Sequence, residues 1–150
     1  MAKQSAGILL FRKRTGTEVF LIHPGGPFFA KKDLGSWSVP KGEYSEEDPL
    51  MAAKREFREE TGFDILGNFV PLLPIKQKGG KVVVAWAVEG DIDAEAVVSN
   101  TFEIIWPPHS GKIQTFPEVD KAGWFSMDLA REKINQAQIS FLDQLEVLLA

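Results

Sequence analysis

The amino-acid sequence predicts an α/β or α+β fold, a sandwich in which helices cover a mixed β-sheet. Two apolar segments near the N-terminus flank a turn and predict a hairpin. The run Val82–Val88 is apolar without alternation, which is typical of a central strand covered on both faces. Residues 49–61 and the C-terminal stretch carry helix signals, so we expect one central and one terminal helix.

The first hairpin is predicted to join Gly7–Arg12 to Glu18–His23 through the turn Arg14–Thr17. Three glycines and two prolines then interrupt Pro24–Gly35, which indicates a loop and a candidate ligand-binding segment. The short apolar piece Trp37–Val39 follows, and regular structure is expected to break after it, at residues 40–42.

The central helix is predicted over Pro49–Thr61 from its two ends. Asp48 is a favoured N-cap residue, and proline suits the first helical position because its missing N–H has no partner there. Gly62 suits the position after the last helical residue, where the backbone often turns left-handed.

The second half of the chain predicts another hairpin, two short strands and the terminal helix. The hairpin lies within Pro71–Glu89, where the paired glycines of Lys78–Lys81 suit a two-residue turn. Phe102–Trp106 and Gly123–Met127 are the expected strands. The terminal helix is indicated by leucines at helical spacing, Leu142, Leu145, Leu148 and Leu149, with Ser140 and Asp143 as a candidate capping box.

Composition predicts one globular domain over residues 1–150, with 44% hydrophobic and 25% charged residues. The net charge of -4 argues against binding duplex nucleic acid through a basic surface. The chain has no cysteine, which excludes disulfides and thiolate metal sites. Its apolar N-terminal run, Ala6–Phe11, is too short for a membrane span, so we expect a cytoplasmic protein without a membrane partner. The sequence leaves the oligomeric state open.

Three carboxylates, Glu56, Glu59 and Glu60, are expected on one face of the central helix because residues three and four apart share a face. They repel one another, and acidic groups near a helix C-terminus also oppose its dipole. Hard carboxylate oxygens are what Mg²⁺ or Mn²⁺ prefers, which favours a metal site. The alternative is a solvated acidic face in which Arg55 and Glu59 form an i,i+4 ion pair, an arrangement common in Glu-rich helices.

The stretch from Gly42 to Phe63 resembles the Nudix box of the MutT-like hydrolases. That pattern reads Gly, five residues, Glu, seven residues, Arg-Glu, an apolar residue, any residue, Glu-Glu, any residue, Gly, apolar. Every specified position from Glu47 onward is met: Glu47, Arg55, Glu56, Phe57, Glu59, Glu60, Gly62 and Phe63. At average amino-acid usage the last nine positions arise by chance roughly once in several million windows. The chain departs from the pattern in one place, since four residues rather than five separate Gly42 from Glu47.

This resemblance implies a Nudix-type α/β/α sandwich and a Mg²⁺-dependent (or Mn²⁺-dependent) pyrophosphohydrolase. Its metal ligands would be Glu56, Glu59 and Glu60, with a loop carbonyl at Lys41 or Gly42. Arg55 would orient a catalytic glutamate, Glu47 would help to hold the box together, and Glu56 would act as the base. Family members differ in which carboxylate takes the proton from water, and that choice stays open here.

Residues outside the box are further candidates for metal or phosphate contacts, and each of them could instead be an ordinary solvated residue. Glu118 precedes a predicted strand and resembles the distal glutamate that many Nudix enzymes contribute, although an ordinary solvated glutamate fits the sequence equally well. Glu103 is a weaker candidate for that role. Lys41 is expected to contact substrate phosphate, and four further lysines are left open: Lys31, Lys32, Lys76 and Lys81.

The aromatic residues Trp37, Tyr44, Trp86 and Trp106 offer surfaces on which a base could stack, but packing is the commoner role of such residues. His23 and His109 lack a partner pattern for metal binding or nucleophilic catalysis, so we expect structural or surface roles.

The approach to the box, Trp37–Gly42, resembles that of Nudix enzymes acting on nucleoside triphosphates and dinucleoside polyphosphates. We therefore expect a small-molecule nucleotide as the substrate and hydrolysis of one of its diphosphate linkages. Two alternatives stay open: an ADP-ribose or nucleotide-sugar diphosphatase, and a non-catalytic nucleotide-binding regulator. Regulators of that kind generally lose box carboxylates, whereas this chain keeps all three.

Overall fold

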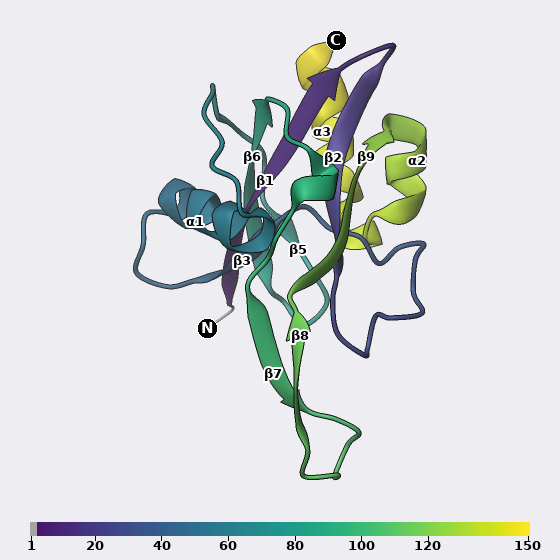
Figure 1. Ribbon diagram of the computed structural model, residues 1–150. Coiled ribbons are helices and arrows are strands. Elements are labelled where there is room, and N and C mark those ends of the chain that lie inside the picture. Colours follow the sequence, from purple (N-terminus) through teal and green to yellow (C-terminus); the bar gives the residue numbers. More distant parts are fainter. Residues whose placement is uncertain (1–2) are drawn as a thin grey trace.

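Three layers form the protein, and a mixed β-sheet is the middle one (Figure 1). The computed structural model describes residues 3–150. The sheet order is β4-β6-β1-β2-β9, with β3 paired to β1 and β5 paired to β6. In chain order the strands and helices are β1 (Gln4–Lys13), β2 (Thr17–Pro24), β3 (Lys41–Tyr44), α1 (Pro49–Thr61), β4 (Val70–Pro71), β5 (Ile75–Lys76), β6 (Val82–Glu89), β7 (Thr101–Ile105), β8 (Ile113–Pro117), β9 (Val119–Ser126), α2 (Met127–Lys133) and α3 (Ile139–Leu149). The expected sandwich with a mixed sheet, a central helix and a C-terminal helix is confirmed.

Strand β6 is central, as its apolar run predicted. It pairs in parallel with β1 over its full length and antiparallel with β4 and β5 on its other side. Successive side chains of a strand point to opposite faces. Val83, Ala85 and Ala87 accordingly join one hydrophobic cluster, while Trp86 and Val88 join the other. The absence of alternation in the sequence reflects this burial on both faces.

The two helical layers cover opposite faces of the sheet. Helix α1 packs Ala52, Ala53 and Phe57 on one face, and α2 and α3 pack Ala130, Phe141, Leu142 and Leu145 on the other. Full burial of one large apolar side chain stabilises a fold by about 1.5–3 kcal/mol, so these contacts anchor both helices. Across residues 3–150 no helix is long and apolar enough to cross a membrane.

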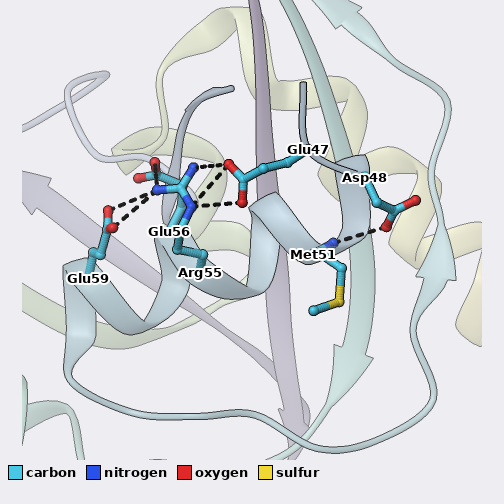
Figure 2. Close-up of polar contacts among 6 residues, drawn as sticks. All are labelled: Glu47, Asp48, Met51, Arg55, Glu56 and Glu59. Atoms are coloured by element: carbon cyan, nitrogen blue, oxygen red, sulfur yellow. Dashed lines mark hydrogen bonds and ion pairs between the residues drawn. The ribbon is translucent and has the colours of Figure 1, made fainter. Parts of the chain in front are cut away.

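Helix α1 has the predicted limits and the predicted caps. The Asp48 carboxylate accepts a hydrogen bond from the Met51 N–H at 3.2 Å (Figure 2). At the other end Gly62 is left-handed, with φ 80°, and its N–H donates to the Arg58 carbonyl. Both ends of the helix are therefore fixed by local interactions, and these fix the position of its acidic face.

The N-terminal hairpin is confirmed, whereas the turn of the second one differs from the expectation. The Gln77 N–H donates to the Lys81 carbonyl and the Gly80 N–H to the Gln77 carbonyl, so the loop has three residues rather than two. Gly79 and Gly80 both have positive φ, as the paired glycines indicated.

The region before α1 was predicted wrongly. The short apolar piece Trp37–Val39 contributes isolated bridges, from Trp37 to Ile134 and from Ser38 to Ile22. Regular structure begins where a break was expected, because β3 pairs with β1 and sets Lys41 opposite Gly7. The pairing is long-range and leaves no local signal.

The strand expected at Phe102–Trp106 is present as β7, one residue earlier at Thr101–Ile105, but it pairs with β8 in a separate ribbon and not with the main sheet. The strand expected at Gly123–Met127 is the second half of β9, which ends at Ser126, where α2 begins. Neither β8 nor α2 was predicted.

The capping box expected in the terminal helix is wrong. Helix α3 already begins at Ile139, and its N-cap Gln138 makes no side-chain capping bond. Ser140 lies inside the helix and accepts a hydrogen bond from Gln144, while Asp143 pairs with Arg131.

Candidate active site

A cleft of about 550 Å³ opens beside α1 and is lined by residues from six parts of the chain. Its lining residues are Pro24, Gly25, Lys41, Gly42, Glu43, Glu56, Glu59, Glu60, Lys81, Phe102 and Glu118. The three helical carboxylates predicted to act together all face it. Five of its six segments come from outside the helix, so the cleft is a product of the tertiary structure.

Gly42 lets the backbone of β3 approach the carboxylate of Glu56. A Cβ atom at residue 42 would lie 2.0 Å from both Cδ and Oε2 of Glu56, far inside van der Waals contact. Only glycine fits without displacing this carboxylate, which is largely buried at 9% exposure. The glycine that opens the box pattern therefore has a steric role here, and this role survives the shorter spacing to Glu47.

Arg55 ties three carboxylates together, as Figure 2 shows. Its guanidinium donates to both oxygens of Glu47, with the shortest contact at 2.6 Å. The Nη1 group donates to Glu56 at 2.8 Å and to both oxygens of Glu59 at 3.1 and 3.2 Å. The ion pair with Glu59 that a solvated acidic helix would show is present, but the same arginine also holds the buried Glu56. Charge-assisted bonds of this kind orient their partners.

Two of the helical carboxylates in the cleft, Glu56 and Glu60, have raised pKa values. Burial raises the pKa of Glu60 to about 8, and the nearby charge of Glu56 adds to the effect, although the backbone N–H of Lys41 donates to Glu60 at 3.0 Å and opposes it. Burial likewise raises the pKa of Glu56, with Glu59 and Glu118 contributing repulsion against the lowering influence of Arg55. Ionised together, these groups destabilise one another, and a cation would relieve the repulsion.

The chemistry of the donor set suits a hard divalent cation, since Glu56, Glu59, Glu60 and Glu118 offer only carboxylate oxygens. In their present positions, no three Asp, Glu or His side chains among residues 3–150 lie close enough together to hold a metal ion. Each helical carboxylate already has a partner, because Arg55 engages Glu56 and Glu59 and the Lys41 N–H engages Glu60. Metal binding would exchange some of these bonds, and the ligand set stays a prediction.

Of the residues singled out beyond the box, Glu118, Lys41 and Lys81 reach the cleft. Glu118 is half-buried, and burial together with the charge of Glu59 raises its pKa. Burial lowers the pKa of Lys41, and the charge of Lys81 adds to the lowering. The other candidates do not line the cleft: Glu103, Lys31, Lys32 and Lys76.

Sequence reasoning missed Phe102, which is the aromatic wall of the cleft. Nothing in its neighbourhood along the chain distinguishes it from a core residue. Trp37, Tyr44 and Trp86 pack against the two hydrophobic clusters, as the commoner role predicted, whereas Trp106 contacts Phe28 instead.

The two histidines have the structural and surface roles expected of them. His23 is fully buried, with Nδ1 2.7 Å from Asp120 and Nε2 2.7 Å from the Lys32 carbonyl. It thereby ties the loop after β2 to the start of β9. His109 is exposed, with φ 64°, between β7 and β8.

The comparisons with known proteins agree on one family. A sequence model of the NUDIX domain matches residues 1–145. A crystal structure of a C. elegans Ap4A hydrolase in a binary complex superposes with a TM-score of 0.64 at 23% identity, covering 99% of this chain and 98% of that one. The NUDIX domain of Shewanella oneidensis NrtR, complexed with ADP ribose, gives 0.68 at 15% identity over 100% and 90%. A mutT/nudix protein from Listeria innocua gives 0.62 at 17% identity over 98% and 93%. No curated protein matches the chain.

Proposed function

The chain belongs to the NUDIX family and is a pyrophosphohydrolase, and from this premise we propose that it hydrolyses a diphosphate linkage of a nucleoside polyphosphate with Mg²⁺ or Mn²⁺ as cofactor. One observation carries the proposal: Glu118, from far along the chain, faces the same cleft as Glu56, Glu59 and Glu60. A fourth carboxylate beside an ordinary solvated acidic helix would only add repulsion, so its presence in the cleft favours a metal site over a solvated face. The substrates we favour are nucleoside triphosphates and dinucleoside polyphosphates.

Each side chain has a role that follows from its position. Glu56, Glu59 and Glu60 would hold the cation, helped by Glu118 and the Gly42 carbonyl. A bound divalent cation supplies charge neutralisation of the polyphosphate and lowers the pKa of water. The Lys41 ammonium contacts a substrate phosphate from the β3 side of the cleft.

Hydrolysis then needs one proton acceptor. A water oxygen forms a bond to phosphorus while the bond from that phosphorus to the bridging oxygen breaks, which leaves two phosphate products. Glu56 accepts the proton released by the attacking water, and Arg55 keeps this carboxylate oriented through its 2.8 Å bond. Burial, which raises the pKa of Glu56, brings it closer to the range useful for a general base.

A second candidate substrate is ADP-ribose. The fold is similar to that of the NrtR NUDIX domain solved with ADP ribose, so the same cleft is to be tested with a nucleotide sugar. A non-catalytic nucleotide-binding role is the remaining alternative, which an activity assay must exclude.

The test is product release from a panel of nucleotides. Purified protein with Mg²⁺ is incubated with nucleoside triphosphates, Ap4A and ADP-ribose, and the products are separated by ion-exchange chromatography. Glu59→Gln is the inactive variant, and Glu46→Gln is its matched control, because Glu46 is an exposed glutamate just before the helix and outside the cleft. We expect turnover of a nucleoside polyphosphate by wild type and Glu46→Gln but not by Glu59→Gln. Nucleotide binding without any product would support the regulator instead.

A further inference from the structure

One face of the β7–β8 ribbon is lined by large apolar side chains. Trp106 follows the last residue of β7 and continues its pairing, because its N–H donates to the Lys112 carbonyl. Side chains four residues apart in such a paired segment point the same way, so Phe102 and Trp106 lie on the same face. Phe116 is directly opposite Phe102 in the register, with their ring centroids 6.1 Å apart. The ribbon therefore carries an aromatic strip along its length.

These rings do not belong to the hydrophobic core. Within residues 3–150 neither buried cluster, nor the residues packed against them, includes Phe28, Phe102, Trp106 or Phe116. The ribbon is a sheet of its own and projects beyond the three layers in Figure 1. Apolar burial in the core thus does not account for this group of aromatic residues.

The loop after β2 packs along the same strip. Gly26 has φ 95°, and a Cβ there would lie 2.7 Å from Cζ of Phe102, so the loop backbone touches this ring. Two residues later Phe28 meets Trp106 edge to face, with centroids 5.3 Å apart and an interplanar angle of 77°. Phe28 nonetheless remains 58% exposed. The loop and the ribbon together hold an aromatic ring that is fixed at its edge and open to solvent.

The strip is continuous with the candidate active site. Phe102 lines the cleft together with the carboxylates, and Gly25, next to Gly26, lines it as well. One side of the site is therefore charged, with Lys41 and the carboxylates, and the adjoining side is aromatic. A ligand that fits both sides carries phosphates at one end and a flat aromatic group at the other.

We propose that the ring of Phe28, held by Trp106 on the ribbon face that Phe102 shares, is the surface on which the nucleobase of the substrate stacks. This inference rests on the proposed function and deepens it, because it assigns the base to the loop and ribbon and the phosphates to the cleft. Stacking of a base on an aromatic side chain contributes about 1–3 kcal/mol and tolerates any base. Phe28 is thus a binding residue that determines preference for nucleotides over phosphates without a base.

The test compares two ligands that share a diphosphate and differ in the base and its sugar. Binding of ADP and of inorganic diphosphate is measured by titration calorimetry with Mg²⁺. Phe28→Ala should weaken ADP binding about tenfold, the fold-change that 1.4 kcal/mol of stacking gives, and change diphosphate binding less than twofold. Phe28→Tyr, which keeps a ring, should restore ADP binding.

The matched control is Ile113→Ala. Ile113 is 67% exposed on the same ribbon, and its pairing with Ile105 places it on the opposite face from Phe102. It should leave binding of both ligands unchanged. Equal weakening of both ligands by Phe28→Ala, or no weakening of ADP, would overturn the assignment. Base-dependent binding without any hydrolysis in the nucleotide panel would reject the proposed activity alone and keep the stacking surface.

Discussion

Substitution of Gly42 by alanine tests the geometry of the cleft most directly. The new Cβ would lie 2.0 Å from Cδ of Glu56, whereas ordinary contact begins at 3.4 Å. The carboxylate must therefore move by about 1.4 Å or more. Such a shift breaks its 2.8 Å bond to Arg55 and takes it away from the position where it would meet water.

The expected loss is about 100-fold or more in kcat/KM, the size of effect that an ångström of misplacement of a catalytic group produces. The fold should survive, because the clashing atoms are the far end of a flexible side chain and β3 accepts alanine. We expect the melting temperature to fall by only a few degrees, roughly the effect of 1–2 kcal/mol in a chain of this size.

The assay is steady-state hydrolysis of the best substrate of the nucleotide panel, with thermal unfolding measured on the same preparations. Gly16→Ala is the matched control, because a Cβ there meets no atom within 4 Å. It should keep wild-type activity and stability. A folded Gly42→Ala protein with activity within threefold of wild type would refute the steric reasoning and the role of Glu56 that depends on it.

Three further predictions concern charge. Glu56→Gln, Glu59→Gln and Glu60→Gln should each lower kcat/KM by roughly 100-fold or more. Glu47→Gln should lower it less, because Glu47 touches only Arg55. Near-wild-type kinetics in all three folded helical variants would mean that this helix face is an ordinary solvated acidic face. Chelation of the metal should abolish turnover. Mg²⁺ at about 100 times its Kd should raise the free energy of unfolding by about 2.7 kcal/mol. An unchanged melting temperature at that Mg²⁺ concentration would count against the proposed metal site. Because the pKa of Glu60 is raised from 4.5 to about 8, the folded metal-free protein holds a proton that the unfolded chain releases. Its stability should fall as pH rises from about 4.5 to about 8, and Glu60→Gln should gain stability over wild type across that range; melting temperatures in chelator check this, and a pH-independent difference would contradict it.

Local signals in the chain were enough to determine helix α1 and its acidic face. Asp48, Pro49 and Gly62 act within one turn of the residues they cap, so their effect can be seen without any tertiary contact. The continuous apolar run of β6 likewise predicts that this strand is buried on both faces, as it is. The family pattern over residues 42–63 rests on the same short-range spacing.

Contacts between distant segments were decided only by the tertiary structure. Ser140 had the residue type for a cap, but α3, which packs against the sheet, begins two residues earlier, with Gln138 at the N-cap position. The apolar segment Phe102–Trp106 had the pattern of a sheet strand, yet its pairing with β8 built a separate ribbon.

The same holds for the candidate active site outside its helix. From the sequence, Glu118 was equally consistent with a solvated surface residue, and only the approach of β8 and β9 to α1 brings it to the cleft. Phe28 and Trp106 are 78 residues apart, and nothing along the chain pairs them. Helix caps and strand burial depend on neighbours within a few residues, whereas the walls of the cleft depend on the register and packing of strands far apart in sequence, which no local pattern encodes.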